Sequence, residues 1–189
     1  MSSLTTSRKV IVHIAASADG YIARADGDLE WLTKRPAPEG FYGMNAFMQT
    51  IDTKVLGRKT FEESLKLGAK FDNEHEHTIV FSHQAPPPGV PRSVEFVNEA
   101  IGKFMNKLRA QPGKDIWLMG GGEIIAAFLD AKAIDEFVIS VVPVFIGDGI
   151  PLIARRHRHV RLDLVSHEKF DDGLVQLRYR VINRGSGEA

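Results

Sequence analysis

The chain has 189 residues, of which 43% are hydrophobic, and its 24 lysines and arginines balance 24 aspartates and glutamates. This length and charge balance fit one soluble domain and offer no basic face for nucleic acid. The sequence contains no cysteine, which excludes disulfides, iron–sulfur clusters and thiolate zinc, and no apolar run that would cross a bilayer, so we expect a cytoplasmic protein without metal or membrane contact.

In chain order, the hydrophobic patterns predict strands that alternate with helices, followed by a C-terminal part in which strands dominate. Residues 10–16 are β-branched and almost continuously apolar, as in a central strand covered on both faces. The further predicted elements are an extended piece at 21–23, helices at 29–32 and 41–51, a strand at 53–56, a helix at 61–65, strands at 77–81 and 94–97, a helix at 99–110, a strand that stops at Gly120, a helix at 123–129, and strands at 135–142, 160–170 and 174–181. This order predicts an α/β fold with a mostly parallel sheet closed by an antiparallel hairpin.

Individual residues indicate where these elements begin and end. Asp28 is predicted to be the N-cap or a first-turn acid of the helix that follows it, and Asn98 is predicted to cap the helix after it. Pro143 should end or bulge the strand before it. The basic run at 155–159 has no interleaved aromatic side chains and is interpreted as a solvated turn. Alternating apolar and polar residues at 174–181 fit a half-exposed strand near the sheet edge.

Two predicted strands stop at glycine directly before a helix. Gly57-Arg58-Lys59-Thr60 forms the first junction, and Gly120-Gly121-Gly122 forms the second. Glycine lets a ligand approach the backbone closely, and the free N–H groups at a helix start attract anions, so both junctions are candidate phosphate or dinucleotide sites. Two alternatives stay open, because three glycines also suit a sharp corner and an arginine and a lysine at a helix start are usually solvated.

Ordered motifs give the chain a resemblance to a known family. A first strand that ends in Ala15-Ala16 is followed by Gly57-Arg58-Lys59-Thr60-Phe61-Glu62, Ile79-Val80-Phe81-Ser82 and Met119-Gly120-Gly121-Gly122-Glu123, in the order found in dihydrofolate reductases. Asp19-Gly20 and the stretch 143–152 resemble still more the reductase domain of the bifunctional riboflavin-biosynthesis protein RibD. The chain is therefore identified as a stand-alone member of the RibD C-terminal, dihydrofolate-reductase-like group. This resemblance implies a three-layer fold with helices on both faces of the sheet.

The resemblance also implies that NADPH binds along the carboxyl ends of the strands. The matching cofactor positions are Ala16 at the nicotinamide carboxamide, Gly57, Arg58, Lys59 and Thr60 at the 2′-phosphate and pyrophosphate, Ser82 and His83 at the adenosine ribose, and Gly120, Gly121, Gly122, Glu123 and Ile124 at a second phosphate-binding turn. In the family this turn contains a cis Gly-Gly peptide bond. The guanidinium of Arg58 favours NADPH over NADH, because it can grip a phosphate that NADH lacks.

Two aspartates are candidates for work on the substrate. Asp28 is the first choice for a catalytic carboxylate, because it precedes Leu29 and Trp31 at the spacing of the pterin-binding acid in dihydrofolate reductases. Asp19 is the second choice, as a substrate-binding residue, and Trp31 is expected to line the acceptor pocket. The structural alternatives are a helix cap for Asp28 and a turn residue for Asp19. Dihydrofolate itself is disfavoured, because the usual Trp-x-Leu-Pro approach is absent and a helix is predicted at 41–51.

The predicted function is NADPH-dependent reduction of a small heterocycle of the aminopyrimidine or pterin type, such as 5-amino-6-(5-phosphoribosylamino)uracil in riboflavin biosynthesis. The alternatives are dihydrofolate-reductase-like activity, a non-catalytic NADPH-binding protein and a flavin-dependent oxidoreductase. The zinc deaminase domain of full RibD needs cysteine and cannot lie in this chain. We expect one domain at 10–182 between a disordered or extended lead, 1–9, and a flexible tail, 183–189. The resemblance also implies a homodimer, since family members often pair through sheet edges.

Overall fold

A sheet of eight strands runs through the computed structural model, which describes residues 7–73 and 75–182. In chain order the elements are β1 (Val10–Ser17), β2 (Tyr21–Ala23), α1 (Glu30–Thr33), α2 (Met44–Thr50), β3 (Ile51–Gly57), α3 (Arg58–Lys66), β4 (His77–Phe81), β5 (Val94–Val97), α4 (Ile101–Arg109), β6 (Asp115–Gly120), α5 (Gly122–Asp130), β7 (Glu136–Val142), β8 (Ile150–Pro151), β9 (Arg161–Lys169) and β10 (Val175–Ile182). The strand order is β5-β4-β3-β6-β1-β7-β10-β9, and β2 pairs with β8 in a small separate sheet.

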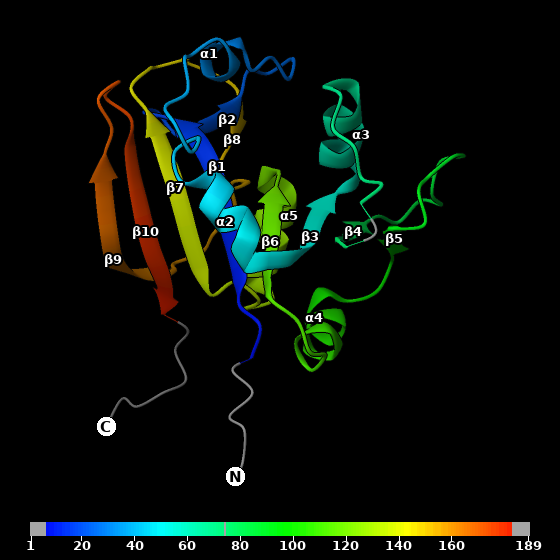
Figure 1. Ribbon diagram of the computed structural model, residues 1–189. Coiled ribbons are helices and arrows are strands. Elements are labelled where there is room, and N and C mark those ends of the chain that lie inside the picture. The colour runs from blue at the N-terminus through cyan, green and yellow to red at the C-terminus, as the bar shows by residue number, and fades with distance from the viewer. Residues whose placement is uncertain (1–6, 74, 183–189) are drawn as a thin grey trace, which may run out of the picture.

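The direction of the strands follows the predicted pattern. The six strands from β5 to β7 are mutually parallel, whereas β10 and β9 continue the sheet as an antiparallel hairpin. The predicted α/β fold with a mostly parallel sheet and a C-terminal hairpin is therefore confirmed. Figure 1 shows the small β2–β8 pair and α1 beyond the carboxyl ends of β1 and β7.

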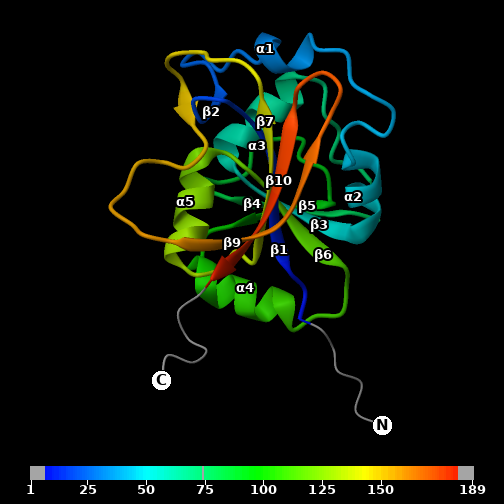
Figure 2. The ribbon, with the colours of Figure 1, turned by 90° about the vertical axis from the view of Figure 1, so that its left-hand side faces the viewer.

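Helices cover both faces of the sheet because successive side chains of a strand point to opposite sides. On β3, Val55 packs in the cluster that contains Phe128 of α5, whereas the next residue, Leu56, packs in the cluster that contains Phe61 of α3. Figure 2 shows α5 and α2 on opposite sides of the sheet. The implied three-layer arrangement is confirmed.

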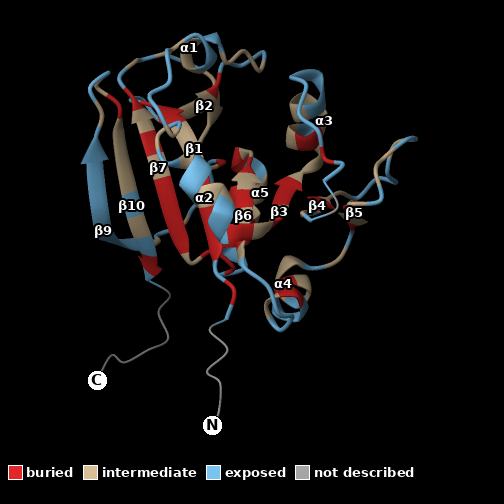
Figure 3. Ribbon diagram, in the orientation of Figure 1, coloured by how far each residue is buried: buried red, intermediate tan, exposed pale blue. Residues whose placement is uncertain are grey.

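Burial along the strands reflects their place in the sheet. Val10 and Val12 on the central strand β1 are completely buried, as their apolar pattern predicted. The edge strand β9 is exposed at all nine positions, and its neighbour β10 has a mixed pattern. Figure 3 shows this change from buried central strands to an exposed outer strand. The hairpin therefore forms one end of the sheet rather than part of its centre.

Two predicted helices have different bounds in the structure. Before α2, Phe41, Tyr42 and Gly43 all have positive φ, so the helix begins at Met44 instead of residue 41. At its end, Ile51 is already buried as the first residue of β3. The helix α4 begins at Ile101 behind an Ala100 cap, so the predicted capping role of Asn98 is wrong. Local periodicity cannot detect these limits, because the same apolar residues serve a helix face, a loop or a strand.

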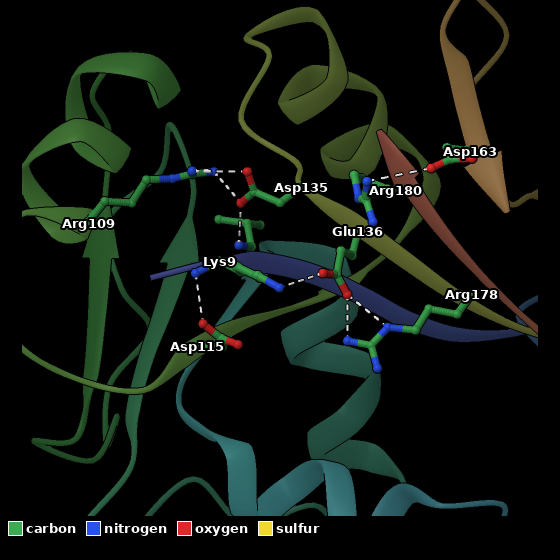
Figure 4. Close-up of polar contacts among 9 residues, drawn as sticks. Lys9, Arg109, Asp115, Asp135, Glu136, Asp163, Arg178 and Arg180 are labelled. Carbon is green, nitrogen blue, oxygen red and sulfur yellow. Dashed lines mark hydrogen bonds and ion pairs between the residues drawn. The ribbon is translucent and has the colours of Figure 1, made fainter. Parts of the chain in front are cut away.

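The amino-terminal end of β7 is fixed by ion pairs to several elements (Figure 4). Lys9 and Arg178 both donate to Glu136, at 2.7 and 2.6 Å. Burial works to raise the pKa of the Glu136 carboxyl, but the hydrogen bonds from Lys9 and Arg178 outweigh it and lower the pKa below its ordinary value. Arg109 pairs with Asp135 at 2.8 Å, which ties α4 to the same place.

The predicted lead and tail lie largely outside the described residues. Within the described part of the lead, Arg8 is buried and donates to Thr53 Oγ1 at 2.6 Å. The tail at 183–189 is not described, and the predicted single domain at 10–182 stays a prediction. Across residues 7–73 and 75–182, no helix is long and apolar enough to span a membrane, and no group of three or more acidic or histidine side chains is arranged to hold a metal ion.

Candidate functional site

The two glycine junctions lie next to each other at the place in the sheet where the connections after neighbouring strands lead to opposite sides. From β3 the chain passes through α3 to β4, and from β6 it passes through α5 to β7 on the other side. The two strands are neighbours, and Leu56 of β3 pairs with Gly120 of β6. In open α/β sheets, ligands bind in the crevice outside the carboxyl ends of the strands at such a switch point. The topology therefore brings both predicted phosphate turns to one place.

At the first junction, Gly57 precedes α3 in an extended conformation, and no side chain caps the helix. Arg58 is held by Glu62, with 2.7 Å from Nε to Oε1, and by the carbonyl of Ala85 at 2.8 Å. Lys59 is exposed and has no ion-pair partner among the described residues. Thus Arg58 is paired within the protein, whereas Lys59 faces solvent.

At the second junction, the peptide bond between Gly120 and Gly121 is cis, as the resemblance implied. The Gly121 amide donates to Thr60 Oγ1 at 2.6 Å, which joins the two junctions directly. The helix α5 begins at Gly122, one residue before the predicted start, and again has no side-chain cap. Its first N–H groups are therefore free of side-chain caps.

The glycines of the second junction also have structural reasons to be glycine. Gly120 has φ of 108°, a conformation that other residues adopt with strain. A Cβ on Gly122 would lie 2.4 Å from the carbonyl oxygen of Pro151. The sharp corner and the binding site, which the sequence left as alternatives, are thus compatible at this turn.

A pocket of about 870 Å³ follows the carboxyl ends of the strands across this switch point. Ten of the predicted cofactor residues line it: Gly57, Arg58, Lys59, Thr60, Ser82, His83, Gly121, Gly122, Glu123 and Ile124. The wall runs from Ile14 on β1 to Val97 on β5, past the ends of five adjacent strands. At about 4.8 Å between strands this is roughly 19 Å, which suits an elongated ligand. Its volume lies within the range of about 300–1,000 Å³ that is usual for small-molecule sites.

At the β4–β5 end, Ser82 and His83 follow the last residue of β4. The Nδ1 of His83 lies 2.8 Å from Oδ1 of Asn98, and Ser82 Oγ donates to the carbonyl of Gln84 at 3.1 Å. Asn98 lines the pocket as well. The sequence had assigned Asn98 to a helix cap, and its position one residue beyond β5 was the signal that places it at the same edge as Ser82.

The remaining predicted residues lie beside the pocket rather than on its wall. Gly120 and Ala16 are buried, and the wall at the end of β1 consists of Ile14 and Ala15. Asp19 accepts hydrogen bonds from Ser17 Oγ and from the amides of two residues in the loop after β7, Ile146 and Gly147. The hydrogen bond from Ser17 is the largest cause of a lowered pKa for the Asp19 carboxyl. In this structure the carboxylate serves to hold that loop against the turn.

Asp28 and Trp31 belong to a segment that borders the pocket, but their neighbours form the wall. Asp26, Gly27, Leu29 and Leu32 line it. Asp28 Oδ1 accepts from the Glu30 amide at 3.1 Å, and Oδ2 lies 3.5 Å from Nε of Arg24. The Trp31 Nε1 is buried without a hydrogen-bond partner. Asp26 therefore joins the pocket as a carboxylate that the sequence reading did not single out.

The basic run after β8 also has a different place from the one predicted. Arg156 lines the pocket, and Arg158 is mostly buried against Asp130 on α5. The interpretation of the run as a solvated turn is wrong for Arg158, whereas Arg156 is exposed as expected although it borders the pocket. Both are fixed by residues far away in the sequence, which is why the run by itself gave no sign of it.

Comparison with known proteins agrees with this geometry. A family model for the RibD C-terminal domain matches residues 8–176. The uncharacterized protein YwjB of Bacillus subtilis (strain 168) is 38% identical over 172 residues, which are 91% of this chain and 97% of YwjB. A crystal structure from Shewanella sp. PV-4, of a protein assigned to riboflavin biosynthesis, superposes with a TM-score of 0.82 at 30% identity and covers 93% of this chain and 99% of its own. The bifunctional diaminohydroxyphosphoribosylaminopyrimidine deaminase and 5-amino-6-(5-phosphoribosylamino)uracil reductase of Thermotoga maritima shares the fold, with a TM-score of 0.71 at 18% identity over 93% of this chain and 57% of its own.

Proposed function

Since the chain belongs to the RibD C-terminal domain family, we propose that it is an NADPH-dependent reductase of a small heterocyclic substrate. The observation that carries the proposal is the long pocket across the switch point, with two uncapped helix starts and the side chains of Arg58 and Lys59 on its wall. Helix starts and cations bind phosphate groups, and a dinucleotide has such groups at separate places along its length. One elongated cofactor explains both junctions together.

The residues that line the pocket fit this cofactor. Gly121 lines the pocket, and its amide donates to Thr60 Oγ1, so the two junctions form one continuous part of the wall. Arg58 is the residue proposed to grip the 2′-phosphate, for which it would exchange its contact with Glu62. Lys59 adds a solvent-facing charge beside it. Bound NADPH would supply a hydride, and the protein would provide position, electrostatics and exclusion of water.

The acceptor is proposed to be an aminopyrimidine or pterin-type heterocycle, in the manner of 5-amino-6-(5-phosphoribosylamino)uracil. The wall formed by Ile14 and Ala15 on β1 and Ile22 on β2 is apolar and suits a flat ring. Asp28 remains the proposed catalytic carboxylate, with Asp19 and Trp31 as proposed substrate contacts. Both aspartates also accept hydrogen bonds within the protein. The proposal therefore requires that substitution of either aspartate lowers turnover by more than the loss of folded protein explains.

Cytoplasmic location and a homodimer are further parts of the proposal. The edge strand β9 supports pairing with a second copy, because it is exposed along its length and carries Leu164 and Val165 at 50% and 46% exposure. An exposed edge strand offers unpaired backbone groups to another chain. Sedimentation velocity of the purified protein, with Leu164→Lys as the variant, tests this pairing.

Binding of the cofactor is the first experiment. We expect NADPH to bind the wild-type protein in a fluorescence titration, and Arg58→Ala to weaken it roughly 10- to 100-fold, as for hydrogen bonds to a charged group. NADH binding should change little, because NADH lacks the 2′-phosphate. Lys66→Ala at the far end of α3 is the matched control, since Lys66 does not line the pocket. Failure of the wild-type protein to bind NADPH would refute the proposal.

The second experiment separates the alternative functions. Oxidation of NADPH is followed with 5-amino-6-(5-phosphoribosylamino)uracil and with dihydrofolate as acceptors. Turnover of only the first supports the proposal, and turnover of only dihydrofolate supports the alternative of dihydrofolate-reductase-like activity. Tight NADPH binding without oxidation by any acceptor supports a non-catalytic binding protein. Visible absorbance of the purified protein tests the flavin alternative.

A further inference from the structure

Arg156 lies on the wall of the pocket and along α5, where it contacts Glu123 in the first turn and Asp130 at the last residue. It comes from the loop after β8, which is separate from both glycine junctions. The main chain just before it is anchored on α5, because the Ala154 amide donates to the carbonyl of Gly122 at 3.1 Å. Close packing of Pro151 on Gly122 fixes the same contact. The main chain that leads to Arg156 is thus packed on α5, and the guanidinium itself is held by ion pairs to Glu123 and Asp130.

One of the two partners of Arg156 does not depend on it. Arg156 Nη1 contacts Asp130 Oδ2 at 2.7 Å, but Arg158 also contacts both carboxylate oxygens of Asp130, at 3.0 and 3.3 Å from Nη2. Arg158 is only 16% exposed, whereas Arg156 is 43% exposed. Asp130 therefore keeps a cationic partner if Arg156 turns away.

The other partner is a carboxylate at the mouth of the pocket. Glu123 stands in the first turn of α5, is 82% exposed, and accepts from Arg156 Nη2 at 3.0 Å. An acid there is favoured by the helix dipole, but it would repel a phosphate group brought to the same N–H groups. Arg156 neutralises this charge, and a phosphate would compete with Glu123 for the same guanidinium.

We propose that Arg156 grips the pyrophosphate of the dinucleotide, and that Glu123 is a resident counter-ion from which Arg156 is released when the cofactor binds. This inference rests on the proposed function, because it takes NADPH as the ligand of the pocket. It divides the phosphate groups between two arginines. Arg58 at α3 reads the 2′-phosphate, and Arg156 at α5 holds the pyrophosphate that NADPH and NADH share.

The division predicts distinct binding losses. Arg156→Gln weakens NADPH and NADH by the same factor, roughly tenfold or more for a lost charged hydrogen bond. Arg58→Ala weakens NADPH alone. Glu123→Gln tightens both dinucleotides, since it removes one of the two carboxylates that pair with Arg156 and a negative charge from the helix start. Arg156→Lys retains the charge without the planar fork and recovers part of the loss.

The test is isothermal titration calorimetry of NADPH and NADH with wild-type protein and these variants, together with Arg155→Gln. Arg155 is an exposed neighbour that does not line the pocket. Thermal unfolding of each variant accompanies the titrations, and we expect the unfolding temperatures to change little because the lost ion pairs are solvent-exposed. Equal losses for the two dinucleotides, with no effect of Arg155→Gln, support the inference.

Three results would overturn the inference. If Arg156→Gln binds both dinucleotides as tightly as the wild type does, Arg156 does not contact the pyrophosphate. If Arg156→Gln binds only NADPH more weakly, Arg156 contacts the 2′-phosphate instead. Weaker binding by Glu123→Gln shows that Glu123 is itself a binding group. All three leave the proposed function in place, because the wild-type protein still binds NADPH. Absence of NADPH binding by the wild type instead refutes the proposed function.

Discussion

Acidification should destabilise this protein through one buried histidine on β1. His13 is 7% exposed, its ring stacks near Phe47 at 4.6 Å between centroids, and its Nδ1 has no hydrogen-bond partner. Burial is the main cause that lowers the pKa of His13 from 6.5 to about 4, and the positive charge of Arg178 adds to it. The folded protein therefore keeps this ring neutral at pH values where the unfolded chain binds a proton.

The sign and size of the effect follow from proton linkage. The stability that depends on neutral His13 is complete above pH 6.5 and is lost as the pH falls from 6.5 through about 4. Each pH unit in this window is worth about 1.4 kcal/mol, so the loss between pH 7 and pH 5 is roughly 2 kcal/mol. Glu136, whose pKa is lowered from 4.5, contributes a loss only at lower pH, as that carboxylate becomes protonated.

The assay is urea unfolding at pH 7 and pH 5 for the wild-type protein and His13→Leu, a substitution that keeps an apolar side chain of similar size. Between pH 7 and pH 5 the free energy of unfolding of the wild type should fall by about 2 kcal/mol more than that of the variant does. Arg178→Met, which removes the lesser cause, should reduce the difference in part. Equal changes in wild type and His13→Leu would refute the reasoning.

Three further predictions concern packing and the predicted substrate residues. Phe128→Ala should lower the free energy of unfolding by about 3–5 kcal/mol in urea titrations, because this ring is fully buried. Gly122→Ala should cost about 1–3 kcal/mol by the clash with the Pro151 carbonyl, whereas Gly102→Ala, with nothing within 4 Å of the new Cβ, should stabilise α4 by about 0.5–1 kcal/mol in the same assay. Asp19→Asn should accelerate amide hydrogen exchange in the loop after β7, and unchanged exchange would contradict its structural role.

Part of the candidate site could be predicted from residue patterns because its residues lie next to strand ends. Gly57 to Thr60 and Gly120 to Ile124 each combine an apolar strand, glycine and a helix start within a few residues. Ser82 and His83 directly follow a strand as well. A parallel sheet places all such ends at one edge, so local signals located the two junctions, and the family resemblance added Ser82 and His83 to the same pocket wall.

The residues that the patterns missed or misplaced are those whose partners are distant in sequence. Asn98 looked like a helix cap until its contact with His83 was known. The carboxylate of Asp19 accepts hydrogen bonds from the amides of residues 127 and 128 positions later in the chain. Asp28 was distinguished by its spacing to Trp31, yet the pocket wall of that segment is formed by neighbours such as Asp26.

The sequence by itself determined the order of strands and helices except for the short strand β8, together with the two glycine junctions and the family resemblance, because each depends on side-chain periodicity or on residues adjacent along the chain. Only the tertiary structure decided that the Gly121 amide bonds to Thr60, joining the junctions into one pocket. It also decided that Arg156, which the sequence places in a basic run, lies on the wall of that pocket. The physical reason is that the partner of a polar side chain depends on which distant segments the sheet brings together, and periodicity carries no information about that pairing.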